Sequence, residues 1–250
     1  MHPNSVERLP FTLTESSVLA VIPARFHSTR LPKKILADIA GKPMIEHVYR
    51  RASASRVHGV IVATDDDRIA DAVRAFGGAA IMTRADHVSG TDRIAEVVAS
   101  LPCRIVVNLQ GDEPLIDPPM IDKAIEPLLA DPSLEISTIS RPIDDPGEFS
   151  SPHVVKVVTT DSGDALYFSR APMAGAAAHV GLYVYRRDTL LRLASTPAAR
   201  LERAESLEQL RALSQGIRIR VVTTEHAAAG VDTLEDLERV RTMFLASSRT

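Results

Sequence analysis

Short apolar runs rich in β-branched residues alternate with amphipathic stretches along most of the chain. Such runs predict strands, and longer amphipathic stretches predict helices. Strands that alternate with helices usually run parallel in one sheet, because each parallel connection needs a long crossover and a helix supplies it. The pattern therefore predicts an α/β protein with a largely parallel sheet flanked by helices.

The expected strands are Val18–Ile22, Val57–Ala63, Ala79–Met82, Arg104–Leu109, Ile136–Ser140, Val154–Thr159, His179–Tyr185 and Ile217–Val222. The expected helices are Pro43–Ser53, Asp66–Phe76, Thr91–Leu101, Pro119–Ala130, Leu201–Ser214 and Thr233–Ala246. Pro43 suits the first position of a helix, and Gly77 suits a cap at the carboxyl end of one.

Composition excludes several classes of function. The net charge of −3 argues against general nucleic-acid affinity, which needs a basic face. Cys103 is the single cysteine, so neither an internal disulfide nor a cysteine-based zinc site can form. No apolar run approaches the roughly 20 residues of a membrane span, and the first 16 residues lack the basic start of a signal peptide. We expect a soluble cytoplasmic protein.

The chain of 250 residues suits one large domain. We expect residues 1–16 to be a disordered extension and residues 17–250 to form a single domain. Three prolines, at positions 142, 146 and 152, interrupt the pattern between residues 141 and 153. This stretch is the expected crossing between a first half, 17–140, and a second half, 141–250.

Four cations follow the first expected strand within ten residues: Arg25, Arg30, Lys33 and Lys34. Open α/β sheets bind ligands at the carboxyl ends of their strands. Arginine offers a fork of donors to phosphate oxygens, and lysine offers a compact charge. The segment therefore suits a ligand with several phosphates, although a solvated basic loop has the same composition. Neither a GxGxxG nor a GxxxxGK[ST] phosphate-binding motif is present in the sequence.

Two aspartates follow extended segments far apart in the sequence. Asp112 ends the apolar strand after Gly111, and a carboxylate there can hold Mg²⁺ together with substrate phosphates; a simple turn before Pro114 is the alternative. Asp232 can converge on the same ion, or Asp232 or Thr233 can cap the last helix. Two carboxylates at separate strand ends are enough for Mg²⁺, which takes its other ligands from phosphate and water.

The segment Ser89-Gly-Thr-Asp-Arg93 precedes an expected helix. Its hydroxyl and amide groups can contact a base or a ribose. The same serine and threonine can instead cap the helix.

In chain order, these segments resemble the 3-deoxy-manno-octulosonate (Kdo) cytidylyltransferase family. The matching pieces are Pro23-Ala-Arg25-x-x-Ser28-x-Arg30-Leu-Pro32-x-Lys34, Gly41-Lys-Pro-Met-Ile45, Val62-Ala-Thr-Asp65, Met82-Thr-Arg-Ala-Asp-His-x-Ser-Gly-Thr91, Asn108-x-Gln-Gly-Asp-Glu-Pro114, Ala165-Leu-Tyr-Phe-Ser-Arg170, His179-x-Gly-x-Tyr183, Leu207-Glu-Gln-Leu-Arg211 and Gly230-Val-Asp-Thr233. The Gly-Lys-Pro-Met motif recurs across sugar nucleotidyltransferases. The set formed by Gln-Gly-Asp-Glu-Pro, Tyr-Phe-Ser-Arg and Leu-Glu-Gln-Leu-Arg is specific to far fewer families.

The resemblance implies a Rossmann-like, GT-A-like nucleotidyltransferase fold with a mostly parallel mixed sheet and a smaller acceptor and dimerisation subregion. Residues 17–140 would mainly bind CTP, and residues 141–250 would mainly serve the sugar acid and dimerisation in a homodimer. The enzyme would transfer CMP from CTP to Kdo with Mg²⁺ as cofactor. It would release pyrophosphate and supply CMP-Kdo for lipopolysaccharide biosynthesis.

The resemblance also assigns roles at the matching positions. The catalytic set would be Arg25, Arg30, Lys34, Asp112 and Asp232, with Asp112 and Asp232 as the metal ligands. The CTP-binding set would be Pro23, Ala24, Arg25, Ser28, Arg30, Lys34, Ser89, Gly90, Thr91 and Asp112. The sugar-acid pocket would be lined by Gln110, Arg170, His179, Tyr183, Glu208 and Gln209.

Within that pocket, a guanidinium such as that of Arg170 suits the carboxylate of a sugar acid. His179 is expected to bind rather than to act as a base. On the expected helix Leu201–Ser214, Glu205 and Gln209 share a face, with Glu208 beside them.

The match weakens in two places. Relatives usually carry a longer segment than the eight residues 171–178, and Lys33 replaces a residue that is usually small. The short segment leaves open a cytidylyltransferase for a related acid, such as 8-amino-Kdo or a sialic-type sugar. A separate alternative is a nucleotide-binding regulator that kept the fold without turnover.

Overall fold

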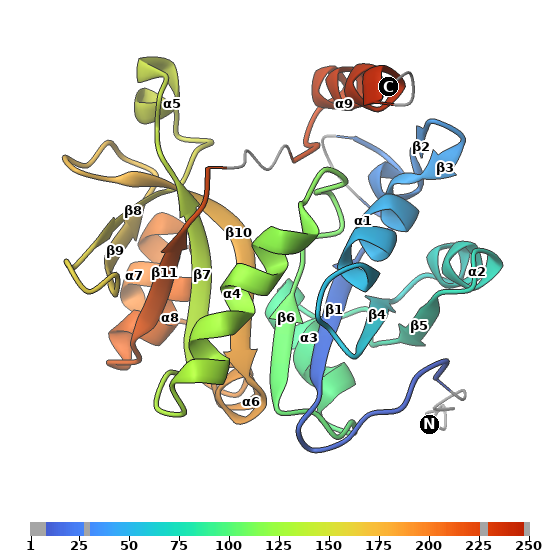
Figure 1. Ribbon diagram of the computed structural model, residues 1–250, viewed down its shortest axis with the longest axis horizontal. Coiled ribbons are helices and arrows are strands. Elements are labelled where there is room, and N and C mark those ends of the chain that lie inside the picture. Colours follow the sequence, from blue (N-terminus) through green and yellow to red (C-terminus); the bar gives the residue numbers. More distant parts are fainter. Residues whose placement is uncertain (1–8, 28–30, 226–229, 248–250) are drawn as a thin grey trace.

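The fold is a continuous mixed β-sheet covered by helices on both faces (Figure 1). It is seen in a computed structural model, which describes residues 9–27, 31–225 and 230–247. Its strands are β1 (Val18–Ala24), β2 (Asp38–Ile39), β3 (Lys42–Pro43), β4 (Gly59–Thr64), β5 (Ala79–Met82), β6 (Ile105–Asn108), β7 (Ile136–Arg141), β8 (Lys156–Thr159), β9 (Ala165–Ser169), β10 (Ala177–Arg186) and β11 (Ile219–Thr223). Its helices are α1 (Met44–Ser53), α2 (Asp67–Ala75), α3 (Gly90–Val98), α4 (Pro118–Ala130), α5 (Pro146–Ser150), α6 (Arg187–Ala194), α7 (Arg200–Glu205), α8 (Gln209–Ser214) and α9 (Leu234–Ser247), with a short 3₁₀ turn η1 (Lys34–Leu36).

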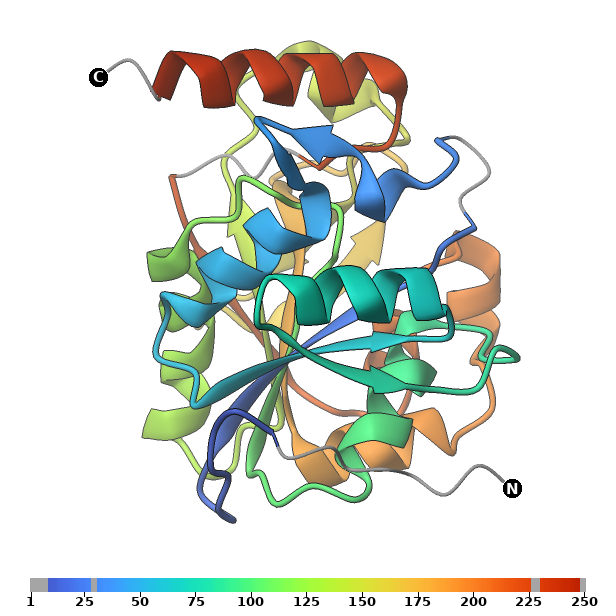
Figure 2. The same ribbon diagram turned by 90° about the vertical axis from the view of Figure 1, so that its right-hand side faces the viewer.

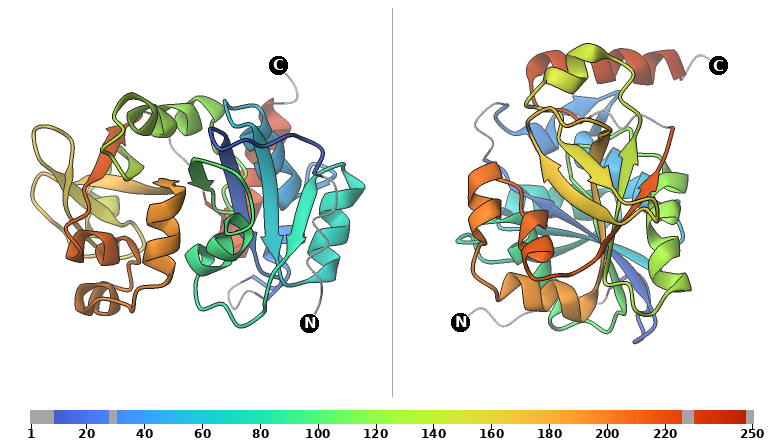
Figure 3. Two further views of the ribbon diagram at one scale, coloured as in Figure 1. Left: turned by 90° about the horizontal axis from the view of Figure 1, so that it is seen from below. Right: turned by 90° about the vertical axis from the view of Figure 1, so that its left-hand side faces the viewer.

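The main sheet has the strand order β11-β7-β10-β6-β1-β4-β5. The four strands from β6 to β5 run parallel, as do β11 and β7, whereas β10 runs antiparallel to both of its neighbours. β8 pairs with β10 and with β9, which extends the sheet beside α7 and α8 (Figure 3). The predicted α/β class and mostly parallel mixed sheet are confirmed.

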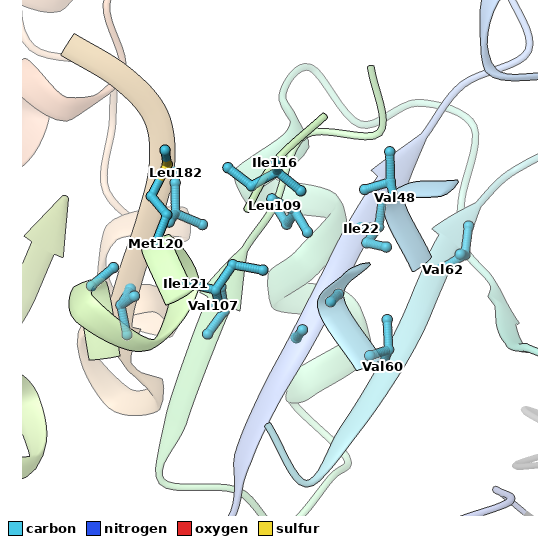
Figure 4. Close-up of a cluster of buried hydrophobic side chains, with 14 of the residues drawn as sticks. Ile22, Val48, Val60, Val62, Val107, Leu109, Ile116, Met120, Ile121 and Leu182 are labelled. Carbon is cyan, nitrogen blue, oxygen red and sulfur yellow. The ribbon is translucent and has the colours of Figure 1, made fainter. Parts of the chain in front are cut away.

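Alternation along β1 shows how the sheet separates two apolar layers. Val18, Ala20 and Ile22 point to the face covered by α1, α2 and α4. Figure 4 shows Ile22 on this face together with Val48 of α1 and Ile121 of α4. Leu19 and Val21 point to the opposite face, which α3 and α6 cover. Because successive side chains of a strand alternate between faces, a strand that is apolar throughout is buried on both.

A third, smaller cluster attaches the last helix. It comprises Ile39, Met44, Val231, Leu237 and Val240, so α9 packs over β2, β3 and the start of α1 (Figure 2). The Arg241 side chain also donates from Nε to the Asp38 carbonyl at 2.8 Å. None of the helices in the described ranges is long and apolar enough to cross a membrane.

The expectation that residues 1–16 form a disordered extension is wrong for residues 9–16. Leu9, Phe11 and Leu13 pack against the cluster on the α3 face. The Phe11 ring lies so close to Gly59 that a Cβ atom at position 59 would be 2.3 Å from it. Apolar residues spaced by two explain this contact, because they are the residues that can bury one side of an extended segment. Residues 1–8 lie outside the described ranges.

The predicted helix Leu201–Ser214 is wrong as a single element. Ser206 has a φ of 54°, in the left-handed region, so the chain divides into α7 and α8. β9 and α6 were not among the expected elements. The expected boundary at residue 140 falls inside β7, which pairs with β10 and β11 of the second half.

Replacing Phe11 with alanine should lower the unfolding free energy by about 1–3 kcal/mol, because it removes a partly buried ring from the core edge. Urea unfolding monitored by circular dichroism measures this change. Thr12→Ala, at an exposed neighbouring position, is the control and should stay within about 0.5 kcal/mol of the parent. Equal stabilities of the two variants would mean that residues 9–13 do not contribute to the core.

Candidate active site

Lys34, Asp112 and Asp232 meet at the carboxyl ends of the parallel strands. The Lys34 Nζ atom is 2.5 Å from Asp112 Oδ2 and 3.1 Å from Asp232 Oδ1. Burial lowers the pKa of the Lys34 ammonium, but the two carboxylates outweigh burial and hold that pKa above its ordinary value. We call these three side chains the carboxylate–lysine cluster. The predicted convergence of the two aspartates is found.

Gly111 explains how Asp112 reaches this position. A Cβ atom at residue 111 would be 3.1 Å from Ile35 Cδ1, tighter than most real contacts. The chain leaving β6 therefore passes directly beneath η1, which carries Lys34 and Ile35. The glycine permits this close approach, and Asp112 follows it into contact with the lysine. The predicted turn before Pro114 is found, because the Glu113 N–H donates to the Gln110 carbonyl at 3.3 Å. The metal-binding role of Asp112 stays a prediction.

Asp232 is brought to the cluster by its own backbone. The Val231 N–H donates to the Asp112 carbonyl at 2.9 Å, which ties two segments that are far apart in sequence. Thr233 and Asp236 form the cap of α9: Asp236 Oδ2 accepts from the Thr233 N–H at 3.0 Å, and Thr233 Oγ1 accepts from the Asp236 N–H at 3.1 Å. Thr233 therefore takes the capping role that was left open between the two residues, and the Asp232 carboxylate contacts Lys34 instead.

The donors in this cluster fit a hard divalent cation. Two carboxylates contact one positive nitrogen, so they can also share an ion. Within the described ranges, no group of three or more histidine, cysteine, aspartate and glutamate side chains forms a closed metal site. An ion bound here would take its remaining ligands from phosphate and water, which matches the habit of Mg²⁺.

The end of β1 lies against the start of α3. A Cβ atom at Gly90 would be 3.2 Å from the Pro23 ring, so a glycine is needed for this close packing. Ala24 is buried at the end of β1. The exposed Arg25 donates from its guanidinium to the His87 carbonyl at 2.6 Å, in the loop before α3. Arg25 is thus held beside α3; Ser28 and Arg30 lie outside the described residues.

Ser89 and Thr91 have separate tasks at the start of α3. Ser89 Oγ accepts from the Asp92 N–H at 3.1 Å and caps the helix, as one of the two readings predicted. Thr91 Oγ1 donates to Glu208 Oε2 at 2.6 Å. This hydrogen bond joins the first half of the chain to the start of α8. The first amides of α3 have no acceptor inside the helix, as in any helix.

His179 and Tyr183 lie together on β10 because the strand bulges between them. The register of β10 against β7 shifts between Val180 and Tyr183, and the two rings lie 5.1 Å apart. Burial raises the pKa of Tyr183 well above its ordinary value, so the phenol stays neutral. A bulge bends a strand and redirects side chains, which here brings two polar rings to one place.

The hydrogen bonds of Thr138 determine the tautomer of His179. Thr138 Oγ1 donates its one proton to the Leu182 carbonyl at 2.7 Å. His179 Nε2 lies 2.9 Å from the same hydroxyl oxygen and must therefore be the donor. The imidazole is then protonated at Nε2 and presents Nδ1 as an acceptor. Burial lowers the pKa of His179 to about 3, so the ring is neutral.

Gln110 and Glu113 lie against the bulge. A Cβ atom at Gly181 would be 3.4 Å from Glu113 Oε1 and 3.7 Å from Gln110 Cγ. Gln110 donates to Asn108 Oδ1 at 3.3 Å. Burial, and secondly Asp112, raise the pKa of Glu113 to about 8, so this carboxyl carries its proton at neutral pH.

Arg170 follows β9, and Glu205 holds its main chain. Glu205 Oε2 accepts from the Arg170 N–H at 3.1 Å, and Glu205 Oε1 accepts from Ser169 Oγ at 2.9 Å. The break at Ser206 separates this glutamate from Glu208, which turns towards Thr91. The predicted shared face of Glu205 and Gln209 is therefore wrong, because the helix that would carry it is interrupted.

Gln209 is buried beside a small cavity of about 20 Å³. That volume holds about one water molecule. Polar lining groups come from the start of α3, from β10 and from α8: Thr91, Tyr183, Tyr185, Glu208, Gln209 and Arg211. The cavity therefore lies where the two halves of the chain meet.

The structure thus joins seven of the predicted site residues into two groups. One is the carboxylate–lysine cluster, and the other gathers His179, Tyr183, Glu208 and Gln209 around β10 and α8. Sequence reasoning missed the supporting contacts of Thr138 and Glu205. Glu205 carried a weak signal, since it lies next to the narrow Leu-Glu-Gln-Leu-Arg motif, whereas Thr138 is one of several polar residues in a strand.

The cytidylyltransferase family profile matches residues 19–219. A 3-deoxy-manno-octulosonate cytidylyltransferase of Solibacter usitatus (strain Ellin6076) is 54% identical over 240 residues, covering 92% of this chain and 95% of the relative. The chain belongs to this family. A second member, from Geobacter sulfurreducens (strain ATCC 51573 / DSM 12127 / PCA), is 54% identical over 244 residues, covering 90% of this chain and 98% of that protein.

Solved structures agree with this family assignment. A structure of CMP:2-keto-3-deoxy-manno-octonic acid synthetase complexed with CTP superposes with a TM-score of 0.89 at 47% identity, covering 93% of this chain and all of that chain. A cytidylyltransferase from Leptospira borgpetersenii serovar Hardjo-bovis (strain JB197) superposes with a TM-score of 0.66 at 19% identity, covering 92% and 87%. The second likeness shows a shared fold only.

Replacing His179 with glutamine should flatten the acid side of the stability profile. Below the unfolded pKa of 6.5, the unfolded chain binds a proton that the folded imidazole does not, so the unfolding free energy falls as pH drops towards 3. Between pH 7 and pH 5 the parent should lose about 1–2 kcal/mol more than the variant. Urea unfolding at these pH values measures the difference.

His153→Gln, at an exposed position, is the matched control and should retain the slope of the parent. Parallel profiles for the parent and His179→Gln would show that this imidazole titrates normally.

Proposed function

We propose that this protein transfers CMP from CTP to Kdo, forming CMP-Kdo and pyrophosphate. Its family makes it a nucleotidyltransferase. The observation that carries the proposal is the carboxylate–lysine cluster, where two distant aspartates meet a lysine at the ligand-binding edge of the sheet. The family relatives named for this reaction and the CTP complex with the same fold support the choice of both substrates.

The CTP end of the site would consist of the basic loop and the start of α3. Lys34 and Arg25, with Arg30, would bind the triphosphate and stabilise the charge on departing pyrophosphate. Phosphoryl transfer requires in-line positioning and charge stabilisation more than covalent help from the protein. The close packing of Gly90 on Pro23 leaves the first amides of α3 beside the end of β1, where they would contact the cytidine.

Asp112 and Asp232 would hold the Mg²⁺ ion. When bound, the ion supplies positive charge to the α-phosphate and orients it for attack. The Lys34 ammonium offsets part of the repulsion between the two carboxylates, so they can lie close together before any substrate arrives. The anomeric hydroxyl of the sugar acid would then attack the α-phosphorus as pyrophosphate leaves.

The acceptor would lie between β10 and α8. Arg170 would pair with its carboxylate, and Gln110, Tyr183, Glu208 and Gln209 would contact its hydroxyls. His179 would accept a hydrogen bond at Nδ1 but would not act as a base, because its pKa of about 3 keeps it a very weak proton acceptor. The neutral, fixed ring therefore fits a binding role.

We also propose that the enzyme acts as a cytoplasmic homodimer in lipopolysaccharide biosynthesis. Residues 17–140 would mainly serve CTP, and residues 141–250 would mainly serve the acceptor and the dimer contact.

A related acid remains the alternative acceptor. Between β9 and β10 the chain has seven residues, 170–176, so little of it can cover the sugar. A short segment would block fewer substituents of the sugar, so an acceptor with an 8-amino group or a sialic-type chain would also fit there. A nucleotide-binding regulator without turnover is disfavoured, because the carboxylate–lysine cluster is intact.

Asp112→Asn and Asp232→Asn should each lower turnover by at least about a hundredfold, because each removes a charge that stabilises the reacting phosphates. Pyrophosphate release with CTP, Kdo and Mg²⁺ measures this effect. Asp161→Asn, on an exposed turn, is the control and should retain parental turnover. Near-parental turnover of either cluster variant would remove that aspartate from the metal site.

The acceptor assignment predicts a clear preference within a panel of acids. With CTP and Mg²⁺, Kdo should give the largest kcat/KM, ahead of 8-amino-Kdo and N-acetylneuraminic acid, and CMP-Kdo should appear in the product mixture. Mass spectrometry of the nucleotide product identifies the acceptor. Greater kcat/KM with another acid would transfer the assignment to it, and release of pyrophosphate with none would favour the regulator.

A further inference from the structure

Lys156 is a lysine buried in β8 with an exposed fraction of 0%. Its Nζ donates to the Ser151 carbonyl and, at 3.1 Å, to the Arg170 carbonyl. In the described ranges, no carboxylate forms an ion pair with it. Lysine is rarely buried without a carboxylate partner, because removing an ammonium from water has a large free-energy cost. Its position therefore requires an explanation beyond packing.

The sheet places Lys156 at the centre of the acceptor side. Its Cα pairs with Ser169 on β9 and with Ala178 on β10. The preceding residue, Val155, accepts a backbone hydrogen bond from the His179 N–H at 2.8 Å. Lys156 is thus the residue of β8 that lies between the strand segments leading to Arg170 and to His179.

Arg170 depends on Lys156 for the position of its main chain. The Lys156 ammonium binds its carbonyl, Glu205 binds its amide, and the Pro152 carbonyl accepts from the guanidinium at 3.1 Å. Three fixed partners hold one exposed arginine, although exposed arginines usually keep much of their rotamer freedom. These contacts restrain the orientation of the Arg170 guanidinium before a ligand binds.

Lys156 and Arg170 place two positive charges near each other, and the Glu205 carboxylate contacts the Arg170 main chain rather than the Lys156 ammonium. Burial, and secondly the neighbouring Arg170, lower the pKa of Lys156. Two cations lie near one another, and the ammonium, which has three donors, contacts two carbonyls. An anion bound by Arg170 would relieve the repulsion between them, and its attraction to a buried charge is screened less than at the surface.

We propose that Lys156 is a positioning residue for the acceptor carboxylate: it fixes the main chain of Arg170 and adds a buried positive charge behind it. This inference rests on the proposed function, and specifically on Arg170 as the group that receives the carboxylate. Lys156 itself does not touch the acceptor. The buried positive charge behind Arg170 would favour an acidic acceptor over a neutral sugar.

Lys156→Met tests the proposal, because it keeps the length of the side chain and removes the charge. We expect KM for Kdo to rise at least tenfold, while KM for CTP changes less than twofold. Lys123→Met, at an exposed position of α4, removes the same charge elsewhere and should change neither constant. An unchanged KM for Kdo, or an equal rise for both substrates, would overturn the proposal.

Lys156→Gln separates positioning from charge and guards against a folding defect in the methionine variant. Glutamine keeps two donors for the two carbonyls, so thermal unfolding should match the parent, and KM for Kdo should still rise several-fold. A parental KM in this variant would overturn the role of the charge.

A double-mutant cycle with Arg170→Ala tests whether Lys156 acts through the arginine. If it does, adding Lys156→Met to Arg170→Ala should raise KM for Kdo by less than twofold, whereas independent effects would multiply. Multiplying effects would overturn the proposal. Pyrophosphate release by the parent protein with Kdo reports on the proposed function separately, so a parent without this activity is distinguished from a parent with activity but unaffected lysine variants.

Discussion

The ammonium of Lys34 lies between the carboxylates of two aspartates that are 78 and 198 residues away in the sequence. Two carboxylates in one place repel each other unless a cation joins them. Lys34 supplies that cation from the protein itself and leaves the cluster with one net negative charge, which suits a further cation. Several local features serve this contact: the glycine before Asp112, the backbone bond from Val231 and the packing of α9.

The two ends of the site differ in how they treat charge. At the nucleotide end, positive groups lie beside acids and are balanced by them. At the acceptor end, Lys156 is buried near Arg170 without an acidic partner in the described ranges. A divalent ion with phosphates suits the first environment, and a single carboxylate suits the second. Under the proposed function, the same sheet would therefore hold its two substrates in environments of different charge.

Sequence reasoning recovered the α/β class, most strands and the convergence of Asp112 and Asp232, because hydrophobic periodicity and strand-end chemistry are local signals. It failed where conformation depends on distant contacts. The residues around Ser206 do not predict its left-handed backbone conformation. This conformation turns Glu205 and Glu208 in different directions. Lys156 was missed because a lysine in a short strand normally faces solvent, and only the fold shows it enclosed.

Residues 9–13 illustrate a similar limit. Their polar neighbours suggested a disordered extension. Leu9, Phe11 and Leu13 instead pack against the buried apolar cluster on the α3 face. A spacing of two among apolar residues is weak evidence in a short segment. It becomes informative when a glycine such as Gly59 offers a flat surface elsewhere, which sequence alone does not reveal.

β10 has a mechanical consequence for catalysis. It pairs with β6, whose end leads to Asp112, and with β7, whose Thr138 orients His179. A hinge that moved the two substrates relative to each other would have to break ladder hydrogen bonds in the middle of the sheet. If the nucleotide and the acceptor bind as proposed, this sheet would fix the spacing between them.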